Sequence, residues 1–514
     1  MRVDPAAHER RWWALGVLTL PVLIISMDST ILGFAVPQLS EALQPSSSQL
    51  LWIVDIYSFV LAGLLITMGS LGDRIGRRRL LVAGAVAFSA ASLLAAFATD
   101  ANMLIGARAL LGVAGATLMP STLSLLRNVF IDPRERQTAI ALWATAFAAG
   151  TALGPIVGGF LLEHYWWGSV FTVGIPVTAL LAVLAPRLVP ESKDPNPGAF
   201  DLVSAGLSMV AMLPTVFAVK LVAERGWSAS AMVALTIGIT AGVVFVRRQR
   251  RLVDPMIDVS LFAVPKFRMA VTGNLVACFG FAGTMFFVTQ HLQLVVGLSP
   301  LRAGVQLLPA VAATIVFMLL APVAARRWGP FAVIAAGLGC GAVGFVLLAQ
   351  VGADGSTAIV TAAVIVLNAG LGAAMTVAVD GIMAAIPAER AGAGASVSET
   401  ANELGIALGT AVLGSIMIAV YRANLGSPTG IGPNDLADAR ETLGAAVSAS
   451  ERLGDPAGPA LLEAARGAFV DGVRTASLVA VVALAVVAAW ALRSRLADSP
   501  KDATAPSVPT AAQR

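Results

Sequence analysis

Residues 49–98 read QLLWIVDIYSFVLAGLLITMGSLGDRIGRRRLLVAGAVAFSAASLLAAFA, two apolar runs joined by a short basic loop. A helix rises about 1.5 Å per residue, so each run is long enough to cross most or all of the roughly 30 Å hydrocarbon core of a bilayer. The loop holds four arginines and one aspartate, Asp73. Two apolar helices around a charged tight turn predict an integral membrane protein.

Apolar runs of this length recur along the whole chain. Its 514 residues are 57% hydrophobic and only 12% charged, whereas soluble proteins contain about 25% charged residues. Most of the surface must therefore face lipid. The sequence predicts fourteen transmembrane helices, at residues 12–37, 49–71, 80–98, 102–126, 138–162, 167–186, 202–221, 229–246, 268–290, 303–324, 330–350, 356–382, 396–420 and 473–492.

Basic residues are distributed unequally between the two sides of the membrane. With the N-terminus in the cytoplasm, about 25 of the 34 Lys and Arg residues fall in cytoplasmic segments. Short loops rich in Lys and Arg remain in the cytoplasm. We therefore expect a multi-pass protein of the cytoplasmic (inner) membrane with both termini inside.

One predicted outer loop, residues 422–472, is unusually long. Within it, Asn434 to Leu453 and Pro459 to Gly472 have helical composition and are separated by Pro and Gly residues that break helices. We expect an extracytoplasmic two-helix hairpin here. A disordered connector is the alternative.

Segments eight spans apart resemble each other. The fifth span contains Gly150-Thr-Ala-Leu-Gly154, and the thirteenth contains Gly405-Ile-Ala-Leu-Gly409. Transporters are often built from such repeats. We expect spans 1–6 and 9–14 to be duplicated halves, with spans 7 and 8 inserted between them and packed peripherally. The predicted organisation is a cytoplasmic N-terminus (1–11), a first six-helix bundle (12–190), inserted helices (191–250), a second six-helix bundle (251–493) and a disordered cytoplasmic tail (494–514).

The loop that follows the second span carries more than positive charge. Its glycines permit close backbone approach, and Asp73 can cap the next helix or pair with an arginine. The stretch Gly69-Ser-Leu-Gly72-Asp73-Arg74-Ile-Gly76-Arg77 resembles the signature loop of the major facilitator superfamily. The resemblance implies an all-α transporter of two six-helix bundles. It also implies gating roles for Gly69, Gly72, Asp73, Arg74, Gly76 and Arg77.

Two further motifs resemble those of particular families within this superfamily. Gly150, Gly154, Pro155, Gly158 and Gly159 resemble the fifth-helix motif of the antiporters of this superfamily, which is associated with export. Glycines four apart let helices pack closely, and Pro155 bends the span. Met27-Asp28-Ser-Thr-Ile-Leu-Gly-Phe-Ala-Val-Pro37 resembles the first-helix motif of the fourteen-span drug:proton antiporters, which include quaternary-ammonium efflux pumps. The resemblance covers about residues 12–420 and the last span.

Three ionisable residues lie within the predicted spans of the first half. A charge at mid-bilayer costs at least about 2.5–3.5 kcal/mol, so it needs a partner, a water-filled cavity or a function. Asp28, Asp55 and Arg108 all fall in the outer half of the bundle. A conformational change that moved Asp28 toward and away from Arg108 would release and bind a proton. We interpret Asp28 and Arg108 as a proton-coupling pair; a static buried salt bridge is the alternative.

Asp55 lies near two aromatic residues, Trp52 and Tyr57. A carboxylate beside aromatic faces suits a lipophilic cation through charge and cation–π attraction. We therefore predict that the three residues bind substrate. An aromatic belt at the outer interface, with Asp55 reaching toward water, is the alternative.

Glu399 and Glu403 are spaced i, i+4 on the thirteenth span and share one helix face. Related antiporters place acidic residues here for substrate or proton binding, and the resemblance carries that role to these two. For Glu399, a solvated helix N-terminus that favours acids is the competing interpretation.

The motifs and the buried charges favour a proton-coupled antiporter that exports lipophilic cationic drugs or antiseptics by alternating access. A dedicated exporter of one natural product or metabolite and a non-transporting membrane sensor are the alternatives. The sequence contains no G-x-x-x-x-G-K-[ST] loop and no Ser–His or metal-ligand cluster within the spans. We therefore expect neither an enzyme nor a bound cofactor or metal. The expected partners of this monomer are organic cations, protons and the lipid bilayer, and not nucleic acid.

Overall fold

The computed structural model describes residues 5–45, 47–194, 201–252, 255–352, 357–426 and 431–497. Within these ranges the regular elements are all helices, and fourteen spans are long and apolar enough to cross a membrane. The predicted all-α class and number of spans are confirmed. The spans are α1 (Pro5–Leu43), α2 (Ser47–Ile75), α3 (Arg77–Ala96), α4 (Ala101–Val129), α5 (Pro133–His164), α6 with α7 (Ser169–Thr172 and Gly174–Leu188), α8 (Leu202–Arg225), α9 (Ala229–Gln249), α10 with π-helix η2 (Pro265–Gln290 and His291–Val295), α11 (Pro300–Trp328), α12 (Pro330–Leu348), α13 (Thr357–Ala384), α14 with π-helix η4 and α15 (Ala391–Leu408, Gly409–Leu413 and Gly414–Asn424) and α18 (Ala457–Ala497).

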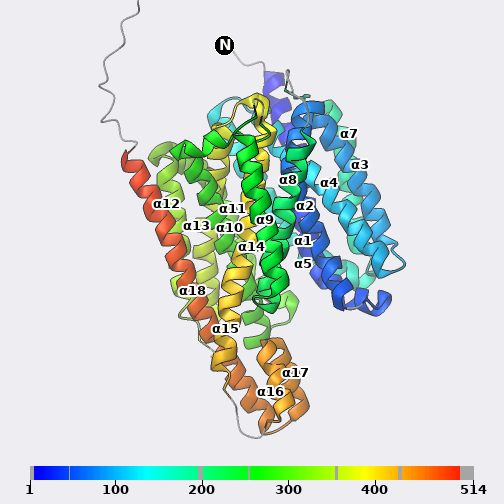
Figure 1. Cartoon of the computed structure of the whole chain (residues 1–514), viewed down its shortest axis with the longest axis vertical. Helices are drawn as coiled ribbons and strands as arrows, with labels where there is room; N and C mark the ends of the chain where they lie inside the picture. Colours follow the sequence, from blue (N-terminus) through cyan, green and yellow to red (C-terminus); the bar gives the residue numbers. More distant parts are fainter. Residues whose placement is uncertain are drawn as a thin grey trace, which may run out of the picture.

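Two separate apolar cores divide these helices into two halves. Helices α1–α7 build one core, and α10–α18 build the other. Figure 1 shows the halves side by side, with α8 and α9 between them in this view. We call the helix ends around residues 72–79 the basic end, and the ends nearest α16 (Pro433–Glu441) and α17 (Leu443–Leu453) the hairpin end.

The two halves meet at the basic end. There, Met318, Val379 and Met383 of the second half pack into the core of the first half. Toward the hairpin end the two halves diverge (Figure 1). The molecule is therefore closed between its halves at the basic end.

Short polar sequences at the loops start the long helices. Asp132 precedes α5 and accepts hydrogen bonds from the backbone N–H groups of Arg134 and Glu135 at 2.7 and 3.4 Å. Proline occupies the next position, where its missing N–H costs nothing. Beyond such caps the sequence is apolar, and in lipid each backbone polar group must bond within its own helix.

In the first half, glycines of α5 bring its backbone against α1. A β-carbon at Gly150 would overlap the carbonyl oxygen of Leu23, and one at Gly154 would lie 3.1 Å from that of Met27. The contacts on both helices are four residues apart, which is one helical turn.

The second half repeats this arrangement. A β-carbon at Gly405 would overlap the carbonyl oxygen of Leu275, and one at Gly409 would overlap that of Phe279. The helix pair α14–η4 on α10 therefore matches α5 on α1, with the same spacing along both helices. The paired glycine motifs in the sequence correspond to equivalent helix contacts.

The inserted helices differ from each other in their surroundings. Helix α9 packs on α8, and most of its span is not buried. Helix α8 contacts α2 of the first half and also α14, η4 and α15 of the second. Only a third of the α8 span is buried, but α8 contacts both halves: Leu213 packs on Gly63 of α2, and Thr67 lies 3.4 Å from the Ser208 hydroxyl.

The long loop at the hairpin end is helical, but its helices begin and end at residues other than those predicted. Thr442 is extended and its hydroxyl caps α17, so the segment 434–453 divides into α16 and α17, which pack together. The second expected helix, residues 459–472, is instead the first part of α18. No proline interrupts the sequence between residues 460 and 497, and its many alanines favour a helix despite Gly467 and Gly472, so a single helix forms.

Candidate functional site

Residues 69–79, at the junction of α2 and α3, form what we call the gate loop. This loop joins the two halves through Asp73. Its carboxylate accepts hydrogen bonds from the backbone N–H groups of Gly392 and Ala393, at 3.0 and 3.2 Å, at the start of α14. It also pairs with Arg77 at 2.7 Å. A carboxylate at a helix N-terminus satisfies unpaired N–H groups and complements the helix dipole. Asp73 therefore fastens α2 to α14.

Arg77 and two glycines complete this junction. The Arg77 guanidinium is fully buried, and it donates to the hydroxyl of Ser192 at 2.8 Å and to the carbonyl of Ala388 at 3.1 Å. A β-carbon at Gly69 would overlap the Ser396 side chain, so only glycine allows α2 this close to α14. Gly76 has φ +110°, which disfavours other residues.

The other gate residues are less constrained. Gly72 is buried, and a β-carbon there would approach the Leu80 side chain at 3.3 Å. Arg74 lies half-buried in the last turn of α2. Gly72 therefore leaves more room for a side chain than Gly69 does.

Further polar contacts between the halves lie at the same end. Arg136 of α5 pairs with Asp380 of α13 at 2.9 Å, and both side chains are nearly buried. Arg127 donates to the carbonyl of Met383 at 3.1 Å. No local pattern predicts that Arg136 pairs with Asp380, because the two residues are 244 positions apart.

Asp28 and Arg108 form a buried ion pair inside the first half. The Arg108 Nη1 donates to Asp28 Oδ2 at 2.7 Å, and Arg108 is 2% exposed. The guanidinium also donates to the carbonyl of Ile53 at 3.2 Å and lies over the Tyr57 ring at 4.7 Å. The structure therefore brings together the two residues that the sequence suggested as a coupling pair, on helices α1 and α4.

Glu399 belongs to a buried polar network between α14 and α10. It is 3% exposed, and its Oε2 accepts from Asn402 Nδ2 at 3.3 Å. Asn402 Oδ1 in turn accepts from Asn274 Nδ2 at 2.8 Å and from the Cys278 thiol at 3.3 Å. The alternative of a solvated helix N-terminus is wrong for Glu399, because this side chain is enclosed two turns inside α14.

Glu403 lies one turn further along α14 and is partly exposed. It interacts electrostatically with Tyr57 of the first half and with Cys278 of the second half. Tyr57 interacts in the same way with Asp28 and Arg108. The two predicted acidic sites are therefore neighbours across the boundary between the halves.

Trp52 takes part in an aromatic cluster that the sequence did not predict. Its ring lies parallel to that of Phe217 of α8, with centroids 6.4 Å apart, and edge-on to Phe59 at 6.0 Å. The side chains of Asp55 and Pro155 lie outside the residues that the structure describes, although both positions are helical.

The export motif of α5 is a packing surface. Gly150 and Gly154 lie against α1 as described, and a β-carbon at Gly158 would overlap the Ile31 side chain at 2.7 Å. Gly159 faces open space, so its β-carbon would meet nothing within 4 Å. Three of the four glycines therefore lie in the contact between α5 and α1, the helix that carries Asp28.

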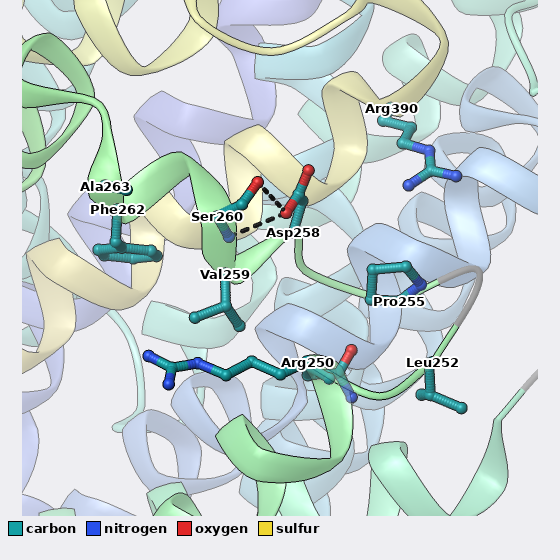
Figure 2. Close-up of a pocket in the computed structure, with 10 residues that line it drawn as sticks. Arg250, Leu252, Pro255, Asp258, Val259, Ser260, Phe262, Ala263 and Arg390 are labelled. Carbon is teal, nitrogen blue, oxygen red and sulfur yellow. Dashed lines mark hydrogen bonds between the residues drawn. The ribbon is translucent and has the colours of Figure 1, made fainter.

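A pocket of about 780 Å³ lies at the basic end, apart from these residues. Figure 2 shows it between the segment after α9 and Arg390. Asp258, near its centre, accepts hydrogen bonds from the backbone N–H and hydroxyl of Ser260 at 2.9 and 2.6 Å. Neither Asp28 nor Glu399 lines this pocket, so it is not the site that the buried charges define.

The molecule has fourteen spans in two halves whose glycines make equivalent helix contacts, and buried charges lie where the halves meet. These features are typical of a secondary transporter. The chain belongs to the Major Facilitator Superfamily, whose family model matches residues 18–410. Its fourteen spans and its relatives place it among the multidrug efflux transporters of that superfamily, as a multi-pass membrane protein.

The sequence relatives cover nearly the whole chain. It is 49% identical over 480 residues to the multidrug efflux pump LfrA of Mycolicibacterium smegmatis, covering 93% of this chain and 95% of the relative. It is 34% identical to the methyl viologen resistance protein SmvA of Salmonella typhimurium, covering 94% and 98%. These relatives are named for multidrug efflux and for methyl viologen resistance.

Solved structures agree on the fold. The human organic anion transporter MFSD10 matches with a TM-score of 0.61 at 14% identity, covering 94% of this chain and 100% of that one. A bacterial homologue of the human lysosomal transporter Spinster, in an inward-facing conformation, matches with a TM-score of 0.59 at 18% identity, covering 96% and 98%.

Proposed function

We propose that this protein exports lipophilic cations across the cytoplasmic membrane in exchange for protons, by alternating access. The observation that carries the proposal is the buried Asp28–Arg108 ion pair, whose guanidinium also lies over the Tyr57 ring. The names of its relatives support drug export.

The basic end faces the cytoplasm in this proposal. Arginines at 74 and 77–79 lie there, as do those at 247, 248, 250 and 251 at the end of α9. Positively charged short loops are retained in the cytoplasm. The structure is then closed toward the cytoplasm, and its halves diverge toward the outside.

Asp28 carries the proton in this scheme. In the described conformation its carboxylate accepts a hydrogen bond from Arg108, which is the arrangement of a deprotonated acid. A proton arriving from outside neutralises Asp28 and removes its attraction for the guanidinium. Arg108 retains the Ile53 carbonyl and the Tyr57 ring as partners. The helix contacts between α1 and α4 can therefore change without leaving the buried guanidinium unpaired.

Glu403 and Glu399 bind the cation in this scheme. A lipophilic cation that leaves water needs a compensating carboxylate in the low-dielectric interior. Glu403 is partly exposed between the halves, and the enclosed Glu399 lies one turn away. Because Glu403 and the Asp28–Arg108 pair both lie within electrostatic range of Tyr57, a charge bound at one site influences the other through space in this scheme.

Inside-out membrane vesicles test this function. A fluorescent lipophilic cation should accumulate in vesicles that contain the protein when a pH gradient is imposed, and dissipating the gradient with a protonophore should release it. Accumulation that persists after the gradient has collapsed would contradict proton coupling. Absence of accumulation for all cations tried would contradict the transport function.

A dedicated exporter of one natural product is the second candidate. The chain is 32% identical over 508 residues to the tetracenomycin C resistance and export protein of Streptomyces glaucescens, covering 95% of this chain and 92% of that protein. A panel of structurally unrelated cations distinguishes the two candidates, because a dedicated exporter moves at most one of them.

A further inference from the structure

Helix α8 lies along the boundary between the two halves, which we call the seam, and contacts α2 on one side and α14, η4 and α15 on the other. On the basic side of the seam, α2 and α14 touch directly: the Ser396 hydroxyl donates to the carbonyl of Leu65 at 2.9 Å. Closer to the hairpin end α8 contacts both sides, since Leu213 packs on Gly63 and the Ser415 hydroxyl donates to the carbonyl of Val222 at 3.5 Å. Where α2 and α14 separate, α8 therefore faces the space between them.

Phe217 is the aromatic residue of α8 at this point. It lies about 22 Å along α8 from Leu202, near the hairpin-side end of the apolar span, which ends at Val219. It packs against the cluster that contains Phe59, as does Leu404 of α14. Leu404 directly follows Glu403, so this aromatic cluster reaches the turn of α14 that carries the proposed cation-binding carboxylate.

The rings around Phe217 present an aromatic surface shared by two helices. Trp52 lies parallel to Phe217, with an interplanar angle of 8°, and Phe59 is edge-on to Phe217 at 6.1 Å. Trp52 is 40% exposed and Phe217 is partly exposed, so both rings keep accessible surface. Aromatic surfaces next to a carboxylate suit a planar organic cation, which gains stacking, cation–π and charge interactions at once.

We propose that Phe217 contacts the substrate and selects for planar aromatic cations, so that the inserted helix α8 forms one wall of the transport site. This inference rests on the proposed export of cations. It assigns α8 a role in substrate recognition in addition to filling the seam. A cation without a ring gains nothing from Phe217 beyond apolar contact.

The test compares Phe217→Leu, which keeps apolar volume but removes the ring, with Phe217→Tyr, which keeps the ring. Transport of ethidium, a planar aromatic cation, and of cetyltrimethylammonium, an aliphatic one, is measured in inside-out vesicles. Phe97→Ala is the matched control, because Phe97 makes a comparable pair with Trp166 at 5.9 Å in the first half and is 61% exposed.

We expect Phe217→Leu to raise the half-saturating ethidium concentration roughly three- to tenfold and to leave that for cetyltrimethylammonium within about twofold. Phe217→Tyr and Phe97→Ala should match the wild type for both cations. Equal shifts for both cations in Phe217→Leu, or no shift, would overturn the inference while leaving cation export intact. If the wild type moves neither cation, the proposed function fails first, and this inference fails with it. Should Phe217→Leu fail to accumulate in the membrane, loss of ethidium transport in Phe217→Tyr alone would overturn the inference.

Discussion

Asp73 in α2 accepts a hydrogen bond from the backbone N–H of Gly392 at 3.0 Å, which links the two halves across 319 residues of sequence. The acceptor is a nearly buried carboxylate, and the donor belongs to the first turn of a helix in the other half. Such charge-assisted bonds are worth about 1.5–3 kcal/mol. Asp73 is therefore expected to contribute to closure of the basic end, together with the Arg136–Asp380 pair.

Replacing Asp73 by Asn should loosen the basic end. The amide carries no charge for Arg77 and presents one oxygen to two N–H groups. With Ser396→Cys as a reporter in a Cys340→Ala background, labelling from the basic side by an impermeant maleimide should be roughly ten- to a hundredfold faster. Arg79→Gln removes an exposed charge from the same loop and should leave the rate unchanged. Equal labelling of Asp73→Asn and the parent would show that this contact does not hold the gate.

The Arg136–Asp380 pair should be replaceable by its reverse. Either single reversal, Arg136→Asp or Asp380→Arg, leaves two like charges buried at the gate and should reduce efflux at least about tenfold. The double reversal restores an opposite pair and should recover much of the activity. A double variant no better than the worse single one would mean that the two residues do not act through their mutual attraction.

Gly154→Leu should block transport while expression is retained. A β-carbon at this position already overlaps the Thr30 side chain, so a larger group pushes α5 away from the helix that carries Asp28. Gly159→Leu is the matched control on the same helix, because that position faces open space. Efflux and membrane abundance are measured for both, and equal efflux would show that close packing at Gly154 is unnecessary.

Neutralising the acids of α14 should affect divalent cations more than monovalent ones. Glu403→Gln and Glu399→Gln each remove one carboxylate, and a second positive charge needs a second anion nearby. We expect affinity losses of roughly ten- to a hundredfold for a dication such as methyl viologen and smaller losses for a monocation. Asp55→Asn should behave similarly if it joins this site. Variants that match the wild type for both cations would remove these acids from the substrate site.

The fold was predictable because lipid imposes a simple rule on sequence. Apolar runs near 20 residues long and glycines at repeated spacing identify the spans and the duplication without any tertiary information. The Asp28–Arg108 pair was predictable for a related reason, because an ionised side chain within the membrane is costly unless it pairs with an opposite charge. The start of α18 was not, because the alanine-rich sequence before residue 475 is charged yet continues the same helix beyond the apolar run.

The site residues that could not be predicted from the sequence have common side chains, and only their position between helices distinguishes them. Phe217 is one of 21 phenylalanines, and only its position on the seam distinguishes it. Asn274 and Asn402 could have been suspected as polar residues in apolar runs, but their partnership depends on how α10 faces α14. Asp73 was predicted to cap a helix or pair with an arginine. It does both, but it caps α14 of the other half, which no local pattern indicates.

Proton coupling at Asp28 is tested most directly in proteoliposomes that contain the purified protein, where an imposed pH gradient drives cation uptake. The wild type should concentrate the cation above its external level, and Asp28→Asn should bind it with unchanged affinity yet only equilibrate it, because no group remains at that position to exchange a proton. If Asp28→Asn concentrates the cation as far as the wild type does under the same gradient, the proton is carried elsewhere and the central claim is wrong.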